Sequence, residues 1–532
     1  MGGTYTLTST FELDPKDSGE NGNTVIYDAY DGQTPVLSGG QTITGWTQVD
    51  TTKNIWQATA PGLQTRQLYI NGKRAIRARS TSGIPGTVTQ TSTGYTTNAT
   101  FTFAVPSDLE FVYTGTVNSY TWVEDRCGVS SITTSGGTTT ITMNPTCWSQ
   151  TSNWGVPTYY ENANELVASA GQWYLNETTG VISYIPRSGE TMSTASVVAP
   201  VLEMLMLGNG TTSSPVHDIQ ISGLTFAYST WLYPSTNHCF YDAQANQITY
   251  STTSMFPPGG VAFHTGQNLK IQGNSFWHIG STGLVLDTGA QGNTIQGNLF
   301  TDISSSAVRI GDILSPNASS STQDTWNNVT NNYVYQAGVE YGGAPGMMAG
   351  FVSNTTFSYN ELEQLPNSGI SMGWGWSTSS GTSNYMSGNK IFGNAVHDYM
   401  QKLVDGGGIY TLGKVGSSSN HTVIHDNYIY NQTNLYAPLY PDQGSAYLDI
   451  YNNVVVAGTL EWLHIWTSSI HDVNVYNNFS DTSKMTNAGT NISLSNNSTA
   501  GTPWSSGAES VIGSAGLQSN YTVVKGWLNN SP

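Results

Sequence analysis

One short phrase recurs through the second half of this chain: an alternating strand pattern that ends in Asn, followed by a second short strand. Examples are NLKIQGNSF, NTIQGNLF, KIFGNAVH and LDIYNNVVV. Internal repeats with a period of about 20 to 50 residues are typical of solenoids. The recurring asparagines are Asn274, Asn298, Asn332, Asn360, Asn394, Asn427, Asn453 and Asn478.

Short strands with period-two alternation, separated by polar turns and without helical periodicity, indicate a β-solenoid. The predicted fold class is therefore all-β, a right-handed parallel β-helix with an inserted β-rich domain. Asn side chains at one repeated turn are expected to bond to those of the coils above and below, which ties coil to coil.

The spacing of the repeat divides the chain into four predicted segments. Residues 1–64 contain strand-like segments such as GGTYTL and TVIYDAY and are interpreted as the first coils, entered as though a preceding N-terminal cap were missing. Residues 65–198 contain hairpin material such as GQWYLNETTGVISYIP and are predicted to form the inserted β-domain. Residues 199–500 form the main β-helix. Residues 501–532 are a C-terminal cap or tail, in which SSGAESVIGSAGL forms a short helix that closes the last coil.

The charge balance argues against two classes of partner. Only 9% of residues are charged, and the net charge is −18 with 16 Lys and Arg residues, so nucleic acid and membranes are not expected to bind. No apolar run has the roughly 18 residues that a membrane span needs. The start, MGGTY, lacks a signal-peptide pattern, so the chain is mature, truncated or cytosolic.

Glycosylation motifs and cysteines bear on the compartment. Asn-x-Ser/Thr acceptors, among them Asn98, Asn176, Asn328, Asn420 and Asn520, suit a secreted glycoprotein, and a secreted monomer is expected. Chance occurrence in an Asn-, Ser- and Thr-rich chain is the alternative. Cys127 and Cys147 either form a disulfide or remain free, and Cys239 is left over.

Two consecutive coils depart from the repeat. In earlier coils the next strand opens nine residues after the Asn, but after Asn394 the comparable Gly408 comes fourteen residues later. After Asn427 the segment LYPDQGSAY replaces the simple turn. Departures from a repeat are where function is expected. These two irregular turns carry Asp405 and Asp442.

Stacked strands lie about 4.8 Å apart, so these two carboxylates are expected about 5 to 10 Å from each other. Glycosidic cleavage needs such a pair, one carboxyl protonated and one ionised. Asp405 is expected to be the nucleophile or base and Asp442 the protonated acid. The three glycines after Asp405 are expected to supply unusual backbone dihedrals and close approach to a ligand. Taken singly, each Asp is a turn residue that bonds its own backbone.

Aromatic and polar residues near the pair suggest a carbohydrate site. Flat rings offer apolar faces to pyranose rings, although ordinary core packing is the alternative for one Trp of each pair. The chain has no zinc-ligand spacing, phosphate loop or GxSxG motif, so neither a metal nor a cofactor is expected. The predicted substrate-binding residues are Trp374, Trp376, Glu340, Tyr341, Tyr410, Gln443, His464 and Trp466.

Several segments resemble a known family. RQLYINGKRAIRAR, SGISMGWGW, DGGGIYTLG and YPDQGS look like the secreted right-handed parallel β-helix proteins related to glycoside hydrolase family 141, and more distantly to families 120 and 136. The resemblance implies hydrolysis of a plant or microbial polysaccharide or oligosaccharide, with Asp405 and Asp442 as the two catalytic acids. The family includes xylanase and α-L-fucosidase activities, so the resemblance does not fix the sugar. Gln443 is a departure, because relatives commonly carry Glu there. If that Glu is the working acid of the relatives, this assignment is wrong and the protein is impaired.

Two other functions stay open at this point. A polysaccharide lyase needs calcium held by clustered acids or a Lys or Arg base, and only Lys402, Lys414 and Arg309 are basic near the altered coils. Its unsaturated product would absorb in the ultraviolet. A non-catalytic carbohydrate-binding or adhesive β-helix, favoured by Gln443, would bind glycans without cleaving them.

Overall fold

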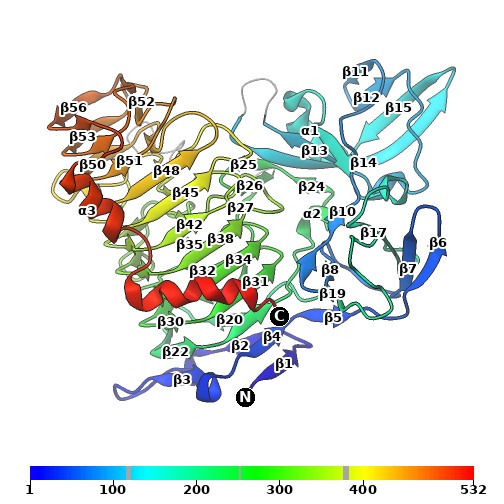
Figure 1. Cartoon of the computed structure of the whole chain (residues 1–532), viewed down its shortest axis with the longest axis horizontal. Coiled ribbons are helices and arrows are strands. Elements are labelled where there is room, and N and C mark those ends of the chain that lie inside the picture. Colours follow the sequence, from blue (N-terminus) through cyan, green and yellow to red (C-terminus); the bar gives the residue numbers. More distant parts are fainter. Residues whose placement is uncertain (116–120, 251–252, 375–382) are drawn as a thin grey trace. The chain divides into compact units, whose positions relative to one another are not determined.

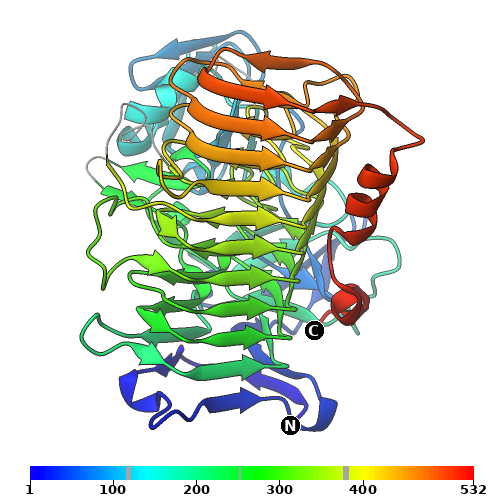
Figure 2. The ribbon, with the colours of Figure 1, turned by 90° about the vertical axis from the view of Figure 1, so that its left-hand side faces the viewer.

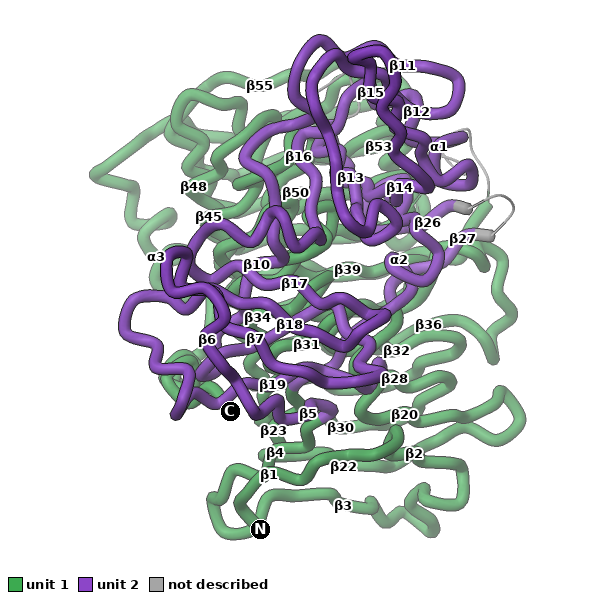
Figure 3. The backbone as a smooth tube through the Cα atoms, turned by 90° about the vertical axis from the view of Figure 1, so that its right-hand side faces the viewer, with its two compact units in different colours: residues 1–38, 204–227, 258–532 green, residues 39–203, 228–257 purple. Residues whose placement is uncertain are grey.

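Most strands stack into three long parallel sheets, and successive coils each contribute one strand to every sheet (Figure 1, Figure 2). The computed structural model describes residues 1–115, 121–250, 253–374 and 383–532. The three sheets belong to unit 1, which comprises residues 1–38, 204–227 and 258–532 (Figure 3). This is the predicted parallel β-helix.

We name the three sheets A, B and C. Sheet A has the order β1 (Gly3–Thr6), β4 (Pro35–Ser38), β23 (Thr225–Ala227), β31 (Ser275–Ile279), β34 (Leu299–Ile303), β38 (Tyr333–Ala337), β42 (Glu361–Glu363), β45 (Ala395–Tyr399), β48 (Tyr428–Gln432), β51 (Val454–Val455), β54 (Phe479–Ser480) and β57 (Ser498–Thr499). Sheet B has the order β2 (Phe11–Leu13), β20 (Met206–Asn209), β28 (Gly259–His264), β32 (Thr282–Asp287), β35 (Val308–Ile310), β39 (Met347–Ala349), β43 (Ile370–Met372), β46 (Ile409–Thr411), β49 (Leu439–Pro441), β52 (Leu463–Ile465) and β55 (Met485–Asn487). Sheet C has the order β3 (Val25–Asp28), β22 (Ile219–Ser222), β30 (Lys270–Gln272), β33 (Thr294–Gln296), β37 (Asn328–Thr330), β41 (Thr356–Ser358), β44 (Lys390–Phe392), β47 (Thr422–His425), β50 (Ala446–Tyr451), β53 (His471–Tyr476) and β56 (Thr490–Ser495).

Two short parallel pairs, β21 (Val216–His217) with β29 (Gly266–Gln267) and β36 (Asp324–Thr325) with β40 (Val352–Ser353), also belong to unit 1.

The core of the β-helix consists of columns of like side chains. In sheet A, Phe226, Phe276 and Phe300 occupy matched positions of successive coils. The rings of Phe276 and Phe300 stack with centroids 4.5 Å apart and planes at 11°. Alternate residues of a strand point to opposite faces, so each coil buries the same register positions.

The predicted asparagines form one continuous ladder between sheets C and A. In each coil the Asn side-chain amide donates to the Oδ1 atom of the next Asn, for example from Asn298 to Asn332 at 2.9 Å and from Asn332 to Asn360 at 3.0 Å. The same Oδ1 atom accepts the backbone N–H of the previous Asn, and the amide also donates to a backbone carbonyl, such as that of Ile271 for Asn298. The ladder extends beyond the predicted positions to Asn497.

The residue before each ladder Asn adopts a left-handed conformation. Gly297, Asn331 and Asn452 have φ values of 64°, 56° and 58°. Gly, Asn and Asp tolerate this region best, which explains the recurrent GN, NN and DN pairs of the sequence. A second, unpredicted Asn ladder begins at the turn from sheet B to sheet C, where Asn293 donates to Asn327 at 2.9 Å.

The C-terminal segment lies along the outer face of sheet A (Figure 2). The expected helix forms as α3 (Ser506–Ser514), and its Ala508 and Val511 pack with Val454 of β51 rather than over the end of the last coil. The 3₁₀ helix η6 (Ser519–Asn529) follows. Across the described ranges, no helix is long and apolar enough to cross a membrane.

Unit 2 comprises residues 39–203 and 228–257, so it contains the interval 65–198 and extends beyond it. Residues 39–64, for which coils were expected, belong to this unit instead, where β7 (Ile55–Thr59) pairs antiparallel with β18 (Val181–Tyr184). One sheet has the order β10 (Ile76–Arg77), β17 (Gln172–Asn176), β18 (Val181–Tyr184), β7 (Ile55–Thr59), β6 (Thr47–Asp50), and a second has the order β5 (Gly40–Thr42), β19 (Val197–Pro200), β8 (Tyr69–Ile70), β9 (Lys73–Arg74). A third has the order β11 (Val88–Thr91), β12 (Gly94–Thr97), β15 (Thr138–Met143), β14 (Glu124–Ser135), β13 (Glu110–Thr114), β16 (Tyr159–Glu161), with β24 (Cys239–Phe240) beside β14. A small sheet has the order β25 (Asp242–Gln244), β26 (Gln247–Tyr250), β27 (Thr253–Met255). The remaining short helices are η1 (Pro15–Asp17) and η2 (Tyr30–Gly32) of unit 1, and η3 (Pro106–Asp108), α1 (Pro145–Thr151), η4 (Ser152–Trp154), η5 (Asn164–Leu166) and α2 (Tyr233–Thr236) of unit 2.

The three cysteines gather in unit 2. Cys127, Cys147 and Cys239 are all buried free thiols, so the disulfide considered between Cys127 and Cys147 is not formed. Burial, followed by the neighbouring thiols of Cys127 and Cys239, raises the pKa of Cys147 well above its ordinary value.

The ladder predicts a large loss of stability from one substitution. Asn360→Ala removes the acceptor of two donors of Asn332 and the donor to the Val329 carbonyl, all of them buried. We expect the free energy of unfolding to fall by about 2 kcal/mol or more, measured by chemical denaturation. Asn497→Ala, at the half-buried end of the ladder, is the control and should cost less. Equal losses in both variants would contradict a cooperative role for the buried ladder.

Candidate active site

Three aromatic side chains with polar groups, Tyr410, Tyr440 and His464, lie side by side on sheet B. Ile409 and Leu439 are paired inward residues of β46 and β49, so Tyr410 and Tyr440, which follow them, point outward in matched register. Their ring centroids are 5.2 Å apart with planes at 88°. His464 of β52 continues the row, with its ring 4.9 Å from Tyr440. Strand spacing of about 4.8 Å is therefore what sets the spacing of this site.

Asp442 lies directly after β49, in a tight turn. The carbonyl of Asp442 accepts the N–H of Ser445 at 2.9 Å, and Gly444 has φ 74°. A type II turn requires positive φ at its third residue, which glycine supplies, so this explains the Asp-x-Gly-Ser pattern. The Asp442 backbone N–H donates to Thr411 of the neighbouring strand at 2.8 Å, which fixes the turn to β46.

Three donors converge on the Asp442 carboxylate. The Tyr410 hydroxyl donates to Oδ2 at 2.5 Å. The Trp466 indole N–H and the Gln443 backbone N–H both donate to Oδ1 at 2.6 Å. Hydrogen bonds to the charged form of a carboxylate stabilise that form, so this arrangement suits an ionised Asp442.

Asp405 lies in a different environment. It has φ 68°, and its backbone N–H donates to the Leu435 carbonyl at 3.0 Å. Among the residues that the structure describes, one side-chain donor reaches it, the Tyr440 hydroxyl at 2.9 Å from Oδ1. Burial, and after it the charge of Asp442, raises the pKa of Asp405 to about 6, although the Tyr440 hydrogen bond opposes this shift. Asp405 is therefore the carboxyl of the pair that is suited to hold a proton.

The sequence-based assignment had the opposite roles, with Asp405 as nucleophile or base and Asp442 as acid. That expectation rested on the local residues of each turn. The donors that distinguish the two carboxylates come from other coils: Tyr410 and Trp466 reach Asp442 from β46 and from the residue after β52. The hydrogen bonding and the pKa of Asp405 favour Asp405 as the proton donor.

The unusual dihedrals expected of the glycines after Asp405 are not found, and their close approach to a ligand stays a prediction. Positive φ occurs at Asp405 itself, and Gly406, Gly407 and Gly408 do not share it. A Cβ atom at Gly407 would lie 2.6 Å from the Ala437 carbonyl oxygen, and one at Gly408 would lie 2.3 Å from a methyl group of Ile429. The glycines are therefore required by close packing against the next coil, which brings Asp405 next to Tyr440.

The other predicted site residues are placed as follows. Tyr410, Gln443, His464 and Trp466 lie at the Asp pair, whereas Trp374 is only 5% exposed and has the burial of a core residue. Tyr341 is fully buried, and Glu340 accepts a hydrogen bond from Ser304 at 3.2 Å. Trp376 lies outside the described residues. The substrate-binding role of these residues stays a prediction.

Sequence reasoning missed Tyr436, Tyr440 and Glu461 as parts of the site. Tyr436 stacks on His464 with centroids 4.6 Å apart, and Glu461 accepts from His464 Nδ1 at 2.7 Å. For Tyr440 a signal existed, because the segments GIYTL and PLYPD place Tyr410 and Tyr440 at the same register position. Tyr436 and Glu461 lie in irregular turns, where no repeat position could identify them.

Comparison with solved structures finds the same fold in carbohydrate-active proteins. A structure described as "Glycoside hydrolase" matches with a TM-score of 0.78 and 23% identity, over 98% of this chain and 91% of that one. The chain shares its fold with a glycoside hydrolase. A complex of XylC with xylose matches with a TM-score of 0.51 and 11% identity, over 93% of this chain and 80% of that one. No protein family model matches the chain, and no curated protein does.

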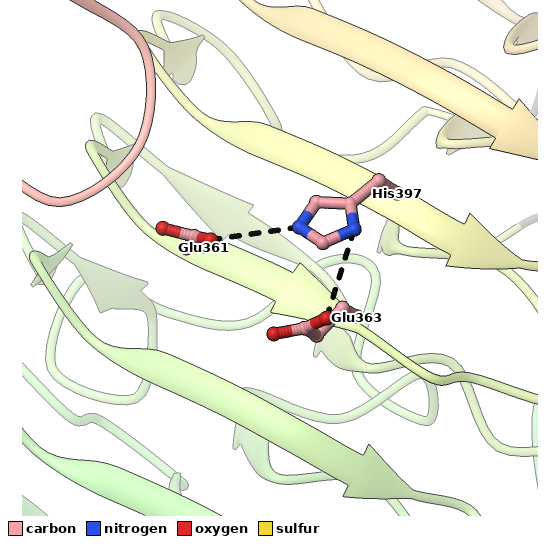
Figure 4. A group of neighbouring side chains, drawn as sticks. All are labelled: Glu361, Glu363 and His397. Atoms are coloured by element: carbon pink, nitrogen blue, oxygen red, sulfur yellow. Dashed lines mark hydrogen bonds and ion pairs between the residues drawn. The ribbon is translucent and has the colours of Figure 1, made fainter. Parts of the chain in front are cut away.

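A second ionisable cluster, on the outer face of sheet A, has the residue types of a metal site. Glu361, Glu363 and His397 have ligand atoms within 4.8 Å of one another. Figure 4 shows the imidazole between the two glutamates, which face different ring nitrogens. The Lys525 ammonium of η6 also contacts Glu361 at 2.5 Å. A metal takes one nitrogen of a ring, so this arrangement suits a hydrogen-bonded imidazolium better than a metal ligand.

This cluster predicts a pH-dependent contribution to stability. Burial lowers the pKa of His397, but Glu361, Asp398 and Glu363 outweigh burial and raise the pKa above its ordinary value. A group whose pKa is higher in the folded state stabilises the fold below its unfolded pKa of about 6.5, and this contribution is lost as pH rises through the folded value. In chemical denaturation, His397→Asn should therefore destabilise the protein more at pH 5.5 than at pH 9. The control is His471→Asn, at a partly exposed histidine of β53. A pH-independent difference between parent and His397→Asn would contradict the imidazolium.

Proposed function

We propose that the protein is a glycoside hydrolase in which Asp405 is the general acid and Asp442 is the ionised carboxylate. The observation that carries this proposal is the unequal environment of two carboxyls on neighbouring coils. From the described part of the chain, Asp442 accepts three hydrogen bonds, whereas Asp405 accepts one and has a pKa raised to about 6. Two carboxyls in different environments, one suited to carry a proton, are the arrangement that glycosidic hydrolysis uses.

In this mechanism Asp405 gives its proton to the glycosidic oxygen as the bond from that oxygen to the anomeric carbon breaks. Asp442 supplies an electron pair to the anomeric carbon, either directly or through a water molecule whose proton it takes. In the direct case, Asp405 as carboxylate then takes a proton from the water that releases the sugar. Tyr410, Trp466 and Gln443 orient the Asp442 carboxylate through the hydrogen bonds that they donate to it.

The charge of the site favours a neutral sugar over a uronate. Among the described residues, the groups that shift the pKa of Asp405 besides burial are Asp442 and Tyr440, and neither is a cation. Polyuronate cleavage by elimination requires cationic neutralisation of the substrate carboxylate. We therefore propose a neutral glycan, with xylosides and α-L-fucosides as the first substrates to test, and an extracellular location where such polymers occur. The relation to family 141 belongs to the same proposal.

Substitution of each carboxylate separates the two roles. On a glycoside with a sugar leaving group, Asp405→Ala and Asp442→Ala should each lose at least about 100-fold in kcat. On the matching glycosyl fluoride, whose leaving group needs little protonation, Asp405→Ala should keep most of the parental rate and Asp442→Ala should not. Reducing-end release and fluoride release are the measurements. Asp472→Ala, at an aspartate of β53 in a different sheet, is the control.

Three outcomes of this experiment would contradict the proposal. Near-parental turnover by either variant on the sugar-leaving substrate would exclude the two-carboxylate mechanism. An ultraviolet-absorbing product would show a lyase, and glycan binding without cleavage by the parent would show a binding protein. Gln443→Glu tests the departure from the relatives: a gain of tenfold or more in the rate would assign the acid to this position instead of Asp405.

The pH dependence provides a further test. Because Asp405 must be protonated, kcat/KM of the parent should fall as pH rises through about 6. Tyr440→Phe removes the hydrogen bond that lowers the pKa of Asp405, so the falling limb of the profile should move to higher pH. Tyr410→Phe is the matched control, since its hydroxyl contacts Asp442. A limb that does not move in Tyr440→Phe would exclude Asp405 as the group that titrates there.

A further inference from the structure

Two exposed aromatic side chains accompany the Asp pair. Within the described part of the site, Trp466 is 42% exposed and Tyr436 is 37% exposed, whereas the neighbouring Tyr410 and Tyr440 are each 3% exposed. Large exposed aromatic side chains next to a polar cleft are a common feature of ligand sites. The apolar face of a pyranose ring packs on such rings.

Each exposed ring lies next to a different carboxylate of the pair. Trp466 donates its indole N–H to Asp442, so its ring is fixed beside the ionised group. Tyr436 lies on the side of Asp405: its ring is 5.8 Å from that of Tyr440, whose hydroxyl donates to Asp405. The backbone supports this placement, because Gly406, next to Asp405, forms a parallel bridge with Tyr436.

The Tyr436 ring is held as a rigid platform. One face stacks on His464 with the planes at 14°, and His464 is fixed in turn by Glu461 at 2.7 Å from Nδ1. Glu461 accepts a second hydrogen bond from Thr486 at 2.8 Å. With one face covered and the residue still 37% exposed, the rest of the ring is available to a ligand. A platform that is already ordered binds without an entropic cost of ordering.

We propose that Tyr436 is the binding platform for the leaving-group sugar and that Trp466 contacts the sugar whose anomeric carbon is attacked. The site then holds at least two neutral sugar rings, one on each side of the scissile bond. This inference rests on the proposed function, because the acid at Asp405 defines the leaving-group side and Asp442 defines the other. Tyr436 is a substrate-binding residue, and His464 and Glu461 are positioning residues that act through it.

The test compares two substrates with the same glycosyl group in parent, Tyr436→Ala and Tyr436→Phe. The probes are β-D-xylosyl fluoride with xylobiose and α-L-fucosyl fluoride with an α-L-fucosyl disaccharide. Fluoride has no sugar to place on Tyr436. We expect Tyr436→Ala to lose about tenfold in kcat/KM on the disaccharide and less than about threefold on the fluoride, while Tyr436→Phe, which keeps the ring, stays near the parent on both.

The positioning role of Glu461 has its own readout. Glu461→Gln should raise KM for the disaccharide and leave the fluoride unaffected, and Tyr436→Ala should abolish this difference because both substitutions act on one platform. Equal losses on fluoride and disaccharide in Tyr436→Ala would overturn the inference while leaving the two-carboxylate mechanism intact. A normal Asp405→Ala variant would overturn that mechanism instead. A parent that cleaves none of the four probes would overturn both.

Discussion

The ladder of buried asparagines is the constraint on which the rest of this structure depends. At each corner between sheets C and A, one side-chain amide satisfies a backbone carbonyl of one coil and the Asn oxygen of another, as Asn298 does with Ile271 and Asn332. A corner buried in a solenoid would otherwise leave backbone groups without partners, at a cost of about 1 to 3 kcal/mol each. Because every rung connects adjacent coils, the ladder also fixes their register.

Register is what assembles the candidate active site. Tyr410 and Tyr440 are matched residues of adjacent strands, and each donates to a different aspartate. A slip of one residue in either coil would turn one of these rings into the core and separate it from its carboxylate. Asn394, Asn427 and Asn453 hold the coils that carry these residues, so they act on the site without touching it.

The asymmetry between the two carboxyls arises from their neighbours rather than from the aspartates themselves. Asp442 ends a strand and receives donors from two other coils and from its own turn. Asp405 precedes a strand, in a segment packed so closely that side chains are excluded at Gly407 and Gly408. The two aspartates thus differ in hydrogen bonding, and burial together with the charge of Asp442 raises the pKa of Asp405.

The sequence by itself determined the β-helix, the Asn ladder and the pair of aspartates. Each of these follows from a local pattern in the sequence: the regular spacing of strands, a polar residue at one repeated position, and two turns that interrupt this spacing. Only the tertiary structure decided which aspartate is suited to hold a proton, why the glycines follow Asp405, and that Tyr436 and Glu461 join the site. These properties depend on atoms from other coils, such as the Tyr440 hydroxyl at Asp405 and the Trp466 indole at Asp442. A repeat pattern specifies which positions stack, but the strength of a hydrogen bond or the burial of a carboxyl depends on distances that exist only after the coils have packed.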